Sequence, residues 1–210
     1  MRSWLRWLTW PRNRVTVDST TGLLTLSLLW LHSVRRLFES LFVSVYSDTE
    51  MNVLHYLTGL AHYFLLPLVV VAETSGFLTA TEFSTSVTSI GPMQLLGVLM
   101  FLLCSFNQHQ CLTKFASMRR NHLGNITNYA HGIPFGGLFD LVSCPHFLYE
   151  IGIYASLFLC LKMAHHLWVY VLIFVVINQT IAALITHKWY SDRFKSQYPA
   201  DRKALIPFIL

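Results

Sequence analysis

LWVYVLIFVVINQTIAALIT, residues 167–186, is the stretch that decides the fold class of this chain. It contains no Asp, Glu, Lys or Arg, and it is as long as the run of about twenty apolar residues that an α-helix needs to cross a bilayer. Lipid offers the backbone no hydrogen-bond partners, so a segment of this kind forms a helix. We therefore expect a transmembrane helix here.

Four further apolar windows lie upstream, at residues 22–46, 53–72, 90–106 and 147–161, the last of them short. Of the 210 residues 54% are hydrophobic and 12% are charged, whereas about 25% of an ordinary soluble domain is charged. We predict an all-α, polytopic transmembrane helix bundle of about five spans with long cytosolic loops. Residues 1–20 form a divergent amino-terminal segment, and residues 21–210 form one membrane domain.

The basic residues predict how the chain is oriented. The formal net charge is +5, but the basic side chains gather at the ends of the apolar windows, which argues against a nucleic-acid partner. Regions rich in Lys and Arg follow the third and the fifth window, whereas residues 73–89 contain neither. By the positive-inside rule the two basic regions and the carboxy terminus are cytosolic. The amino end is then lumenal, in conflict with its own arginines, Arg2, Arg6, Arg12 and Arg14.

Polar residues interrupt the first two windows in a regular way. His32, Arg35, Arg36 and Glu39 are spaced by three and four residues and so share one helical face. This stripe is either structural, through an Arg35–Glu39 ion pair or an interfacial helix, or the wall of a cavity. In the second window two histidines, His55 and His62, lie one heptad apart; we expect them to pack or to line a pocket, and we predict no metal site.

The segment HGIPFGGLFDLVSCPHFLYE, residues 131–150, brings His, Asp and Glu to the mouth of an apolar window. Its glycines let a backbone approach a ligand closely. Ser143 and Pro145 predict a capped helix start. His146 and Glu150 are four residues apart and face the same way, and Glu150 either serves the site or merely pairs with a neighbouring His or Arg.

Many polar residues belong to the predicted cytosolic rim. They could share one pocket, in which Arg and Lys bind phosphate and the His, Asn and Glu side chains bind amide or ribose groups. The chain contains no soluble-type nucleotide motif and no hydrolase motif. The residues alone indicate a membrane enzyme or transporter with an anionic, cytosol-facing ligand. The rim residues are Asn107, His109, Arg119, Arg120, His131, Asp140, His146, Glu150, His187, Arg202 and Lys203.

Two of these stretches resemble a known family. Residues 131–150 and the ending YPADRKALIPFIL, residues 198–210, are similar to the carboxy-terminal domain of the steroid 5α-reductase family. Within it, LHSVRRLFESLFVSVYS at residues 31–47, the Pro145–His146 pair and the Asn178–Gln179 pair resemble the polyprenol (polyprenal) reductase branch. The resemblance runs from about residue 24 to 210, and residues 131–210 are its most specific part.

The resemblance implies a multi-pass enzyme of the endoplasmic reticulum membrane that uses NADPH. It would reduce the α-isoprene double bond of polyprenol or polyprenal, on the route to the dolichol that supports protein N-glycosylation. Its partners would be the polyprenoid substrate and membrane lipids, with no metal and no nucleic acid. The implied cofactor contacts are Asn107, Arg119, His131, His146, Glu150 and His187.

The chain also departs from the family pattern. His131 replaces the tyrosine, and His146 the asparagine, of steroid-type members, although both residues still donate hydrogen bonds. Family members carry two further spans upstream that supply the polar pair acting on the substrate carbonyl. The resemblance covers the last five of the family's seven helices and not those two, so no catalytic residue is carried over. Ser33 stands roughly where steroid-type members place a tyrosine, and a serine is a much weaker proton donor.

Four alternatives stay open. Two are reactions of the same family, a 3-oxo-5α-steroid 4-dehydrogenase and an enoyl-thioester reductase. A third is a membrane methyltransferase of similar architecture that uses S-adenosylmethionine. The fourth is an inactive, shortened family member that acts only as a membrane binding partner.

Overall fold

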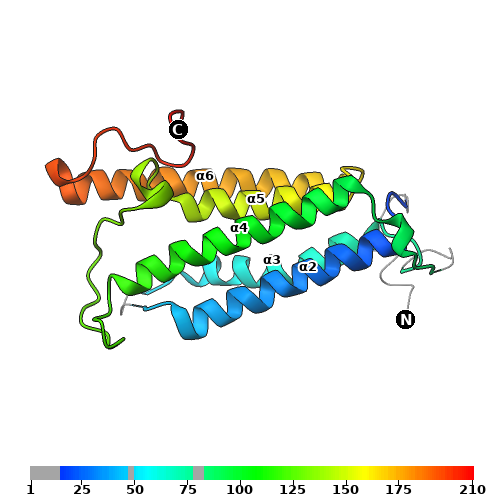
Figure 1. The fold of residues 1–210 in the computed structure, drawn as a ribbon, viewed down its shortest axis with the longest axis horizontal. Coiled ribbons are helices and arrows are strands. Elements are labelled where there is room, and N and C mark those ends of the chain that lie inside the picture. The colour runs from blue at the N-terminus through cyan, green and yellow to red at the C-terminus, as the bar shows by residue number, and fades with distance from the viewer. Residues whose placement is uncertain (1–14, 47–49, 78–82) are drawn as a thin grey trace. The chain divides into compact units, whose positions relative to one another are not determined.

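The computed structural model describes residues 15–46, 50–77 and 83–210. Within these ranges the chain forms five α-helices, α2 (Ser19–Phe38), α3 (Val53–Ala72), α4 (Pro92–Ser117), α5 (Pro145–Cys160) and α6 (His166–Phe194) (Figure 1). A π-helical segment, η1 (Glu39–Val43), continues α2, and three short 3-10 helices are η2 (Val87–Ser89), η3 (Gly137–Asp140) and η4 (Lys195–Gln197). The all-α prediction is confirmed. The amino-terminal arginines and most of segment 1–20 lie outside the described residues.

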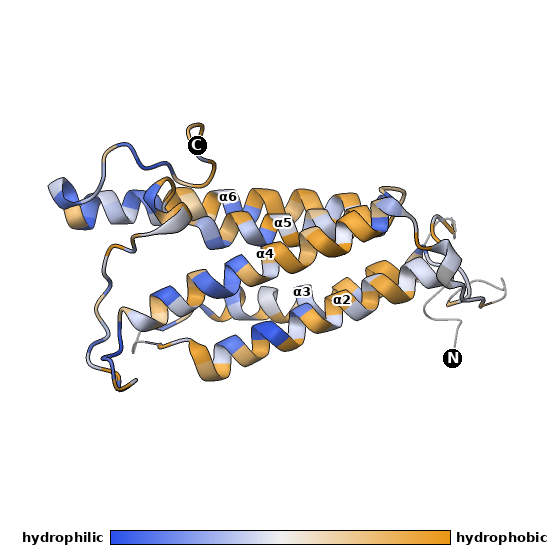
Figure 2. Cartoon of the chain, in the orientation of Figure 1, coloured by the Kyte–Doolittle hydropathy of each residue, from blue (hydrophilic) through white to orange (hydrophobic). Residues whose placement is uncertain are grey.

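The long helices carry the apolar surface that a membrane protein needs. α3, α4 and α6 with its η4 extension are long and apolar enough to cross a bilayer, and only 11% of the apolar window of α3 is buried within the protein. Apolar residues cover most of each helix, while polar residues gather toward the carboxy ends of α4 and α6 (Figure 2). α5 is the short helix predicted from residues 147–161 and has 16 residues. These helices form a membrane helix bundle.

Helix starts follow from local sequence. Pro92 is the first residue of α4, where its missing amide hydrogen costs no helical hydrogen bond. The side chain of Gln94 accepts a hydrogen bond from the amide of Gly91 at 2.8 Å, which satisfies an amide just before the helix. The side chain of Asn52 caps α3 by accepting from the amide of Leu54 at 2.8 Å. α5 begins at Pro145 as expected, but the hydroxyl of Ser143 bonds elsewhere and does not cap it.

Two helices run further than their apolar windows predict. α4 continues through the polar residues after position 106 as far as Ser117, and α6 continues to Phe194. The helix accommodates these polar residues because they find partners: Asn107 donates to the carbonyl of Leu103 at 2.8 Å, and His109 contacts Glu39 at 2.9 Å. The carboxy-terminal parts of α4 and α6 are therefore helical and carry polar side chains, whereas the sequence predicted loops there.

The chain divides into two compact units. Unit 1 contains residues 1–35, 50–101 and 154–173, and unit 2 contains residues 36–49, 102–153 and 174–210. α2, α4, α5 and α6 each contribute residues to both units, whereas α3 belongs to unit 1.

Unit 1 is packed around aromatic side chains. Tyr154 and Trp168 stack at 6.0 Å, and the indole of Trp168 donates to the carbonyl of Tyr154 at 3.1 Å. His62 and the hydroxyl of Tyr154 share a hydrogen bond of 2.7 Å. A side chain at Gly97 would meet the sulfur of Cys160 at 2.7 Å, so only glycine permits this approach of α4 to α5. His62 thus belongs to the packing of unit 1, one of its two predicted roles.

The polar stripe of the first window is structural in part. In unit 1, Arg35 contacts the buried His32 at 3.2 Å, and His32 stacks near Tyr63 at 6.5 Å. In unit 2, the fully buried carboxylate of Glu39 pairs with Arg36 at 2.8 Å and with His109 at 2.9 Å. Glu39 is therefore anchored by two cationic or hydrogen-bonding partners, as buried carboxylates require.

Candidate functional site

The two sequence stretches that carry the family resemblance contact each other in unit 2. The amide of Ser143 donates to the carbonyl of Lys203 at 2.8 Å, that of Cys144 to Ala204 at 3.1 Å, and that of Lys203 to Leu141 at 2.9 Å. Val142 and Lys203 form a parallel bridge. The carboxy-terminal segment is thereby attached by its backbone to the residues that lead into α5.

A glycine turn positions the residues before this attachment. Gly136 and Gly137 have φ angles of +96° and +61°, which favour glycine because a side chain would be strained there. The carboxylate of Asp140 accepts a hydrogen bond from the amide of Gly136 at 2.8 Å and closes the turn. Asp140, one of the rim residues, therefore has a structural role. The turn leads to Phe139, which is buried.

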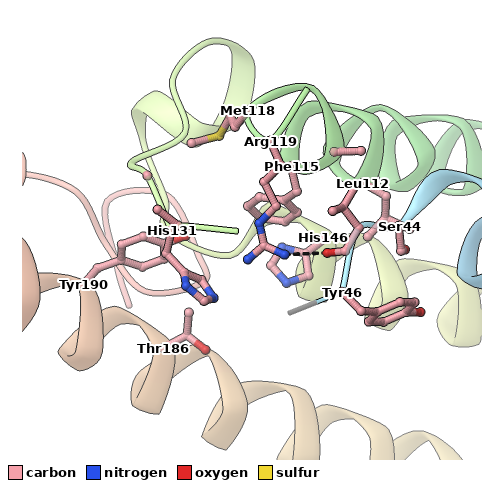
Figure 3. Close-up of a pocket in the computed structure, with 14 residues that line it drawn as sticks. Ser44, Tyr46, Leu112, Phe115, Met118, Arg119, His131, His146, Thr186 and Tyr190 are labelled. Atoms are coloured by element: carbon pink, nitrogen blue, oxygen red, sulfur yellow. Dashed lines mark hydrogen bonds between the residues drawn. The ribbon is translucent and has the colours of Figure 1, made fainter. Parts of the chain in front are cut away.

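A cavity of about 300 Å³ opens in unit 2 between α4, the loop at residues 130–132 and α6, and we call it the Arg119 cavity (Figure 3). Its volume lies at the lower end of small-molecule sites, which measure about 300–1,000 Å³. Arg119, His131 and His146, three of the six expected cofactor contacts, line it together. Tyr46, Thr186 and Tyr190 complete much of its wall.

Arg119 and His131 give this cavity its basic character. One guanidinium nitrogen of Arg119 donates to the carbonyl of Val45, which fixes the side chain at the cavity wall. The ring of His131 contacts that of Trp189 edge to face at 5.2 Å. Burial lowers the pKa of His131, and the positive charges of Arg119 and Arg193 lower it further. His131 is therefore held in its neutral form beside fixed positive charge, which suits an anionic ligand.

His146 is the most constrained member of the cavity. Its ring lies against Phe147 at 4.1 Å and against Phe115 at 5.2 Å. Its Nδ1 atom is buried and has no hydrogen-bond partner among the described residues. A buried polar atom without a partner costs roughly 1–3 kcal/mol, so a ligand that supplies one gains affinity.

Asn107 lies on a different cavity. This second cavity, of about 260 Å³, is also in unit 2 and includes Lys114, Phe139 and Tyr149 in its wall. Phe139 contacts Phe115, which lines the Arg119 cavity, at 5.3 Å. The two aromatic rings thus touch where the walls of the two cavities meet. Of the eleven rim residues, Arg119, His131 and His146 line the Arg119 cavity, and Asn107 does not.

Glu150 is buried and hydrogen-bonded to Gln108. The side-chain amide of Gln108 donates to the carboxylate of Glu150 and also to the carbonyl of His146 at 3.2 Å. The predicted structural alternative, pairing with a neighbour, is therefore present, and Gln108 is one such partner. Glu150 lines neither cavity.

His187 belongs to a hydroxyl network. Its Nδ1 atom lies 2.6 Å from the hydroxyl oxygen of Ser143, which is itself buried and also contacts the hydroxyl of Tyr198. The ring of Tyr198 stacks on Tyr190 at 5.5 Å with an interplanar angle of 8°. Tyr190 in turn lines the Arg119 cavity, so this network supports the wall behind it.

Arg202 is a buried cation that has no hydrogen-bond acceptor in the part of the chain that the structure describes. It is 3% exposed, and none of its three side-chain nitrogens has a hydrogen-bond partner among the described residues. Its guanidinium lies over the rings of Phe135 and Tyr198 at 5.1 and 5.2 Å. We call these three residues the Arg202 cluster. Burying a charge without a partner costs on the order of several kcal/mol, so the arrangement is suited to an anion that arrives with the ligand.

Sequence reasoning had included Arg202 only among eleven rim residues and had not singled out Ser143 or Tyr198 as site residues. The signal for Tyr198 and Arg202 was their place in the family-like ending, but which groups they meet depends on contacts with residues far away in the chain. Among the described residues, no group of three or more His, Cys, Asp or Glu side chains could hold a metal ion.

Comparison with known proteins adds an independent finding. The family described as 3-oxo-5-alpha-steroid 4-dehydrogenase matches residues 69–210. Three relatives are each named polyprenal reductase. The protein from Caenorhabditis elegans is 47% identical over 92% of this chain, that from Danio rerio 43% over 87%, and that from Homo sapiens 34% over 90%.

These matches cover only part of the relatives. They span 62%, 59% and 60% of the three relatives in the same order, so this chain spans about three fifths of their length. The region that the family matches, residues 69–210, includes the second cavity, the Arg202 cluster, all six expected cofactor contacts and the Arg119 cavity apart from Ser44, Val45 and Tyr46.

Proposed function

This chain belongs to the 3-oxo-5-alpha-steroid 4-dehydrogenase family, and from this premise we propose that it is a membrane oxidoreductase that reduces the α-isoprene double bond of polyprenal with NADPH. The relatives named polyprenal reductase favour this substrate over a steroid. The reaction would serve the dolichol pathway and protein N-glycosylation at the endoplasmic reticulum membrane, with the carboxy terminus in the cytosol.

The observation that carries the cofactor assignment is the buried guanidinium of Arg202. A phosphate offers several acceptor oxygens and negative charge, which is what three unpartnered nitrogens on a 3% exposed cation require. A neutral ligand would leave the charge uncompensated. A phosphorylated dinucleotide satisfies this requirement and also offers ribose and amide groups to histidines such as His146.

The residues of unit 2 divide the work of binding. Arg119 and Arg202 would hold phosphate groups, and Arg is suited to this because its planar fork matches phosphate oxygens. His131 and His146 would hydrogen-bond ribose or amide groups in the Arg119 cavity. At about 300 Å³ this cavity fits one end of a dinucleotide rather than the whole.

When bound, a reduced nicotinamide would supply a hydride to the electron-poor double bond, and a proton from the site or from water would complete the reduction. The protein contributes positioning, exclusion of water and charge. Phe115, Phe139 and Phe147 surround His146 and its neighbourhood with apolar rings, which strengthens the hydrogen bonds that form there. No proton donor is assigned among the described residues.

The direct test is a polyprenal reduction assay in membranes that contain the full chain, with NADPH compared with NADH. We expect a saturated aldehyde to form with NADPH and much less of it with NADH. His146→Phe should lower the turnover, because it keeps the ring volume and removes the buried Nδ1. If polyprenal is not consumed with either cofactor, the chain does not carry this activity by itself.

A 3-oxo steroid is the second candidate substrate, because the matched family is described by that reaction. Offering polyprenal and a 3-oxo-4-ene steroid to the same membranes separates the two. S-adenosylmethionine in place of NADPH, scored by the melting temperature in detergent, separates the reductase from a membrane methyltransferase.

A further inference from the structure

The hydroxyl of Ser143 lies at the centre of three hydrogen bonds. It is 2.6 Å from Nδ1 of His187 and 3.0 Å from the carbonyl oxygen of Lys203, and it also contacts the hydroxyl of Tyr198. Ser143 is 1% exposed, so water does not compete for these contacts.

The number of protons decides the direction of each bond. A serine hydroxyl has one proton to donate and lone pairs to accept two further bonds. A carbonyl oxygen only accepts, so three simultaneous hydrogen bonds require that the proton of Ser143 goes to Lys203. The other two bonds must then be donated to Ser143, one by the hydroxyl of Tyr198 and one by Nδ1–H of His187.

A neutral histidine that carries its proton on Nδ1 has a bare lone pair on Nε2. We propose that Ser143 is a positioning residue that holds His187 as this tautomer, so that Nε2 accepts a hydrogen bond from the dinucleotide. The donor would be a ribose hydroxyl or the carboxamide amino group. The dinucleotide part of this inference rests on the proposed function.

The backbone supports the same arrangement. The amide of Ser143 donates to the carbonyl of Lys203 at 2.8 Å, which fixes the backbone that carries the hydroxyl beside the carboxy-terminal segment. Tyr198 is held by its stacking on Tyr190 at 5.5 Å. The ring of His187 makes no other hydrogen bond among the described residues, so its Nε2 is available.

His187 and Arg202 would then bind different groups of the ligand. The lone pair on Nε2 of neutral His187 repels a phosphate oxygen and attracts a donor, whereas the guanidinium of Arg202 does the opposite. A ribose that carries both a phosphate and a hydroxyl offers one group to each residue.

The tautomer can be measured without cofactor. The full chain, labelled with ¹⁵N-histidine in nanodiscs, is compared with His187→Gln to identify the His187 signals. We expect Nδ1 to carry the proton and Nε2 to be bare at neutral pH. A proton on Nε2, or equal populations of both tautomers, would overturn the proposal without any further variant.

Binding measurements test the consequence. Ser143→Ala should release the tautomer and weaken NADPH binding about 10-fold, the size of one hydrogen bond, whereas Ser143→Thr, which keeps the hydroxyl, should stay near wild type. Tyr198→Phe should leave the tautomer unchanged, because Ser143 still accepts from His187. Unaltered NADPH affinity in Ser143→Ala, despite a changed tautomer, would refute the role in binding.

Two partial ligands identify the donor. Adenosine 2′,5′-bisphosphate carries the ribose hydroxyl and phosphates of the adenosine half, whereas reduced nicotinamide mononucleotide carries the carboxamide and the ribose hydroxyls of the nicotinamide half. The one whose binding Ser143→Ala weakens contains the donor, and if neither weakens, the proposal fails. If the wild-type chain carries the His187 proton on Nδ1 but does not bind NADPH, the proposed function is contradicted and the tautomer assignment is still supported. A chain that reduces polyprenal with Nε2–H would contradict the tautomer alone.

Discussion

Two buried charged side chains of this protein, Glu73 and Arg202, differ in whether they have hydrogen-bond partners among the described residues, and this difference distinguishes a structural residue from a ligand-binding one. In unit 1, the carboxylate of Glu73 accepts hydrogen bonds from the hydroxyl of Thr16 at 3.2 Å and from the amide of His166 at 2.7 Å. In unit 2, the guanidinium of Arg202 is more deeply buried and has no acceptor among the described residues. Folding alone explains the first arrangement, whereas the second is suited to a ligand.

The Glu73 arrangement has a familiar physical logic. His166 is the first residue of α6, so the negative charge of Glu73 lies at the positive end of that helix and binds one of its unsatisfied amides. Thr16 also donates its backbone amide to the carbonyl of Glu73 at 2.9 Å. Both the carboxylate and the backbone carbonyl of Glu73 therefore form hydrogen bonds that stabilise the fold of unit 1.

Removing the charge of Arg202 should have the largest effect on binding. We expect Arg202→Leu to weaken NADPH binding by about 10- to 100-fold, since a charge-assisted hydrogen bond contributes about 1.5–3 kcal/mol. The same change should not lower the melting temperature without cofactor, because it removes an uncompensated buried charge. Arg202→Lys, which keeps the charge and loses the fork, is the matched control and should bind with intermediate affinity. Loss of stability with unchanged affinity would make Arg202 a structural residue.

Glu73→Ala should show the opposite pattern. It removes the cap of α6 and the partner of Thr16, so the free energy of unfolding should fall by about 2 kcal/mol. NADPH affinity at a temperature where the variant is folded should equal that of wild type. Chemical denaturation in detergent measures the first quantity and a cofactor titration the second. A large loss of NADPH affinity would contradict a purely structural role of Glu73.

A smaller effect concerns His131 and pH. Its pKa is lowered by burial and by the charges of Arg119 and Arg193, so its proton is lost below the ordinary value of 6.5. An anion bound beside it would raise that pKa, and binding would then take up a proton. NADPH affinity should therefore increase as the pH falls from 7.5 toward 6. His131→Gln should flatten this dependence, and an equally steep profile in the variant would assign the proton to another group.

The smallest effect belongs to the ion pair of Asp18 with Lys162 in unit 1, at 2.7 Å. Burial by itself raises the pKa of Asp18, but hydrogen bonds from Lys162 and Thr21 outweigh it and lower the pKa to about 2. A lowered carboxyl pKa stabilises the fold above the unfolded value near 3.8, and this contribution is lost as the pH falls toward 2.

Because both side chains of this pair are more than a third exposed, the contribution should stay below about 1 kcal/mol. Melting of wild type and Asp18→Asn between pH 5 and 2 measures it. The two curves should converge at the acid end, and parallel curves throughout would contradict the assignment.

Much of the fold could be predicted from the sequence, because apolar length determines which segments form membrane helices. α3 has the predicted bounds of residues 53–72, and α5 begins within two residues of its window. The extension of α4 to Ser117 was missed because Gln108 and His109 looked like a helix exit. Their partners, Glu150 and Glu39, are brought to them only by tertiary packing.

The site was predicted less completely for the same reason. Arg119, His131 and His146 were expected together and do line one cavity. Asn107 was expected with them and lies on the other cavity, since it is within α4 whereas Arg119 follows the end of that helix, and the neighbouring elements decide what each residue meets. The hydrogen bond between Ser143 and Tyr198 joins residues 55 positions apart, and no local sequence pattern predicts it.

The most direct test of the central claim, that unit 2 binds a phosphorylated dinucleotide, is thermal unfolding of the purified full chain in detergent with NADPH, NADH or neither. A ligand at 100 times its Kd stabilises a folded protein by about 2.7 kcal/mol. We predict a clear rise in Tm with NADPH and a smaller one with NADH. The same Tm under all three conditions, with millimolar cofactor and a cooperative transition, would contradict the account.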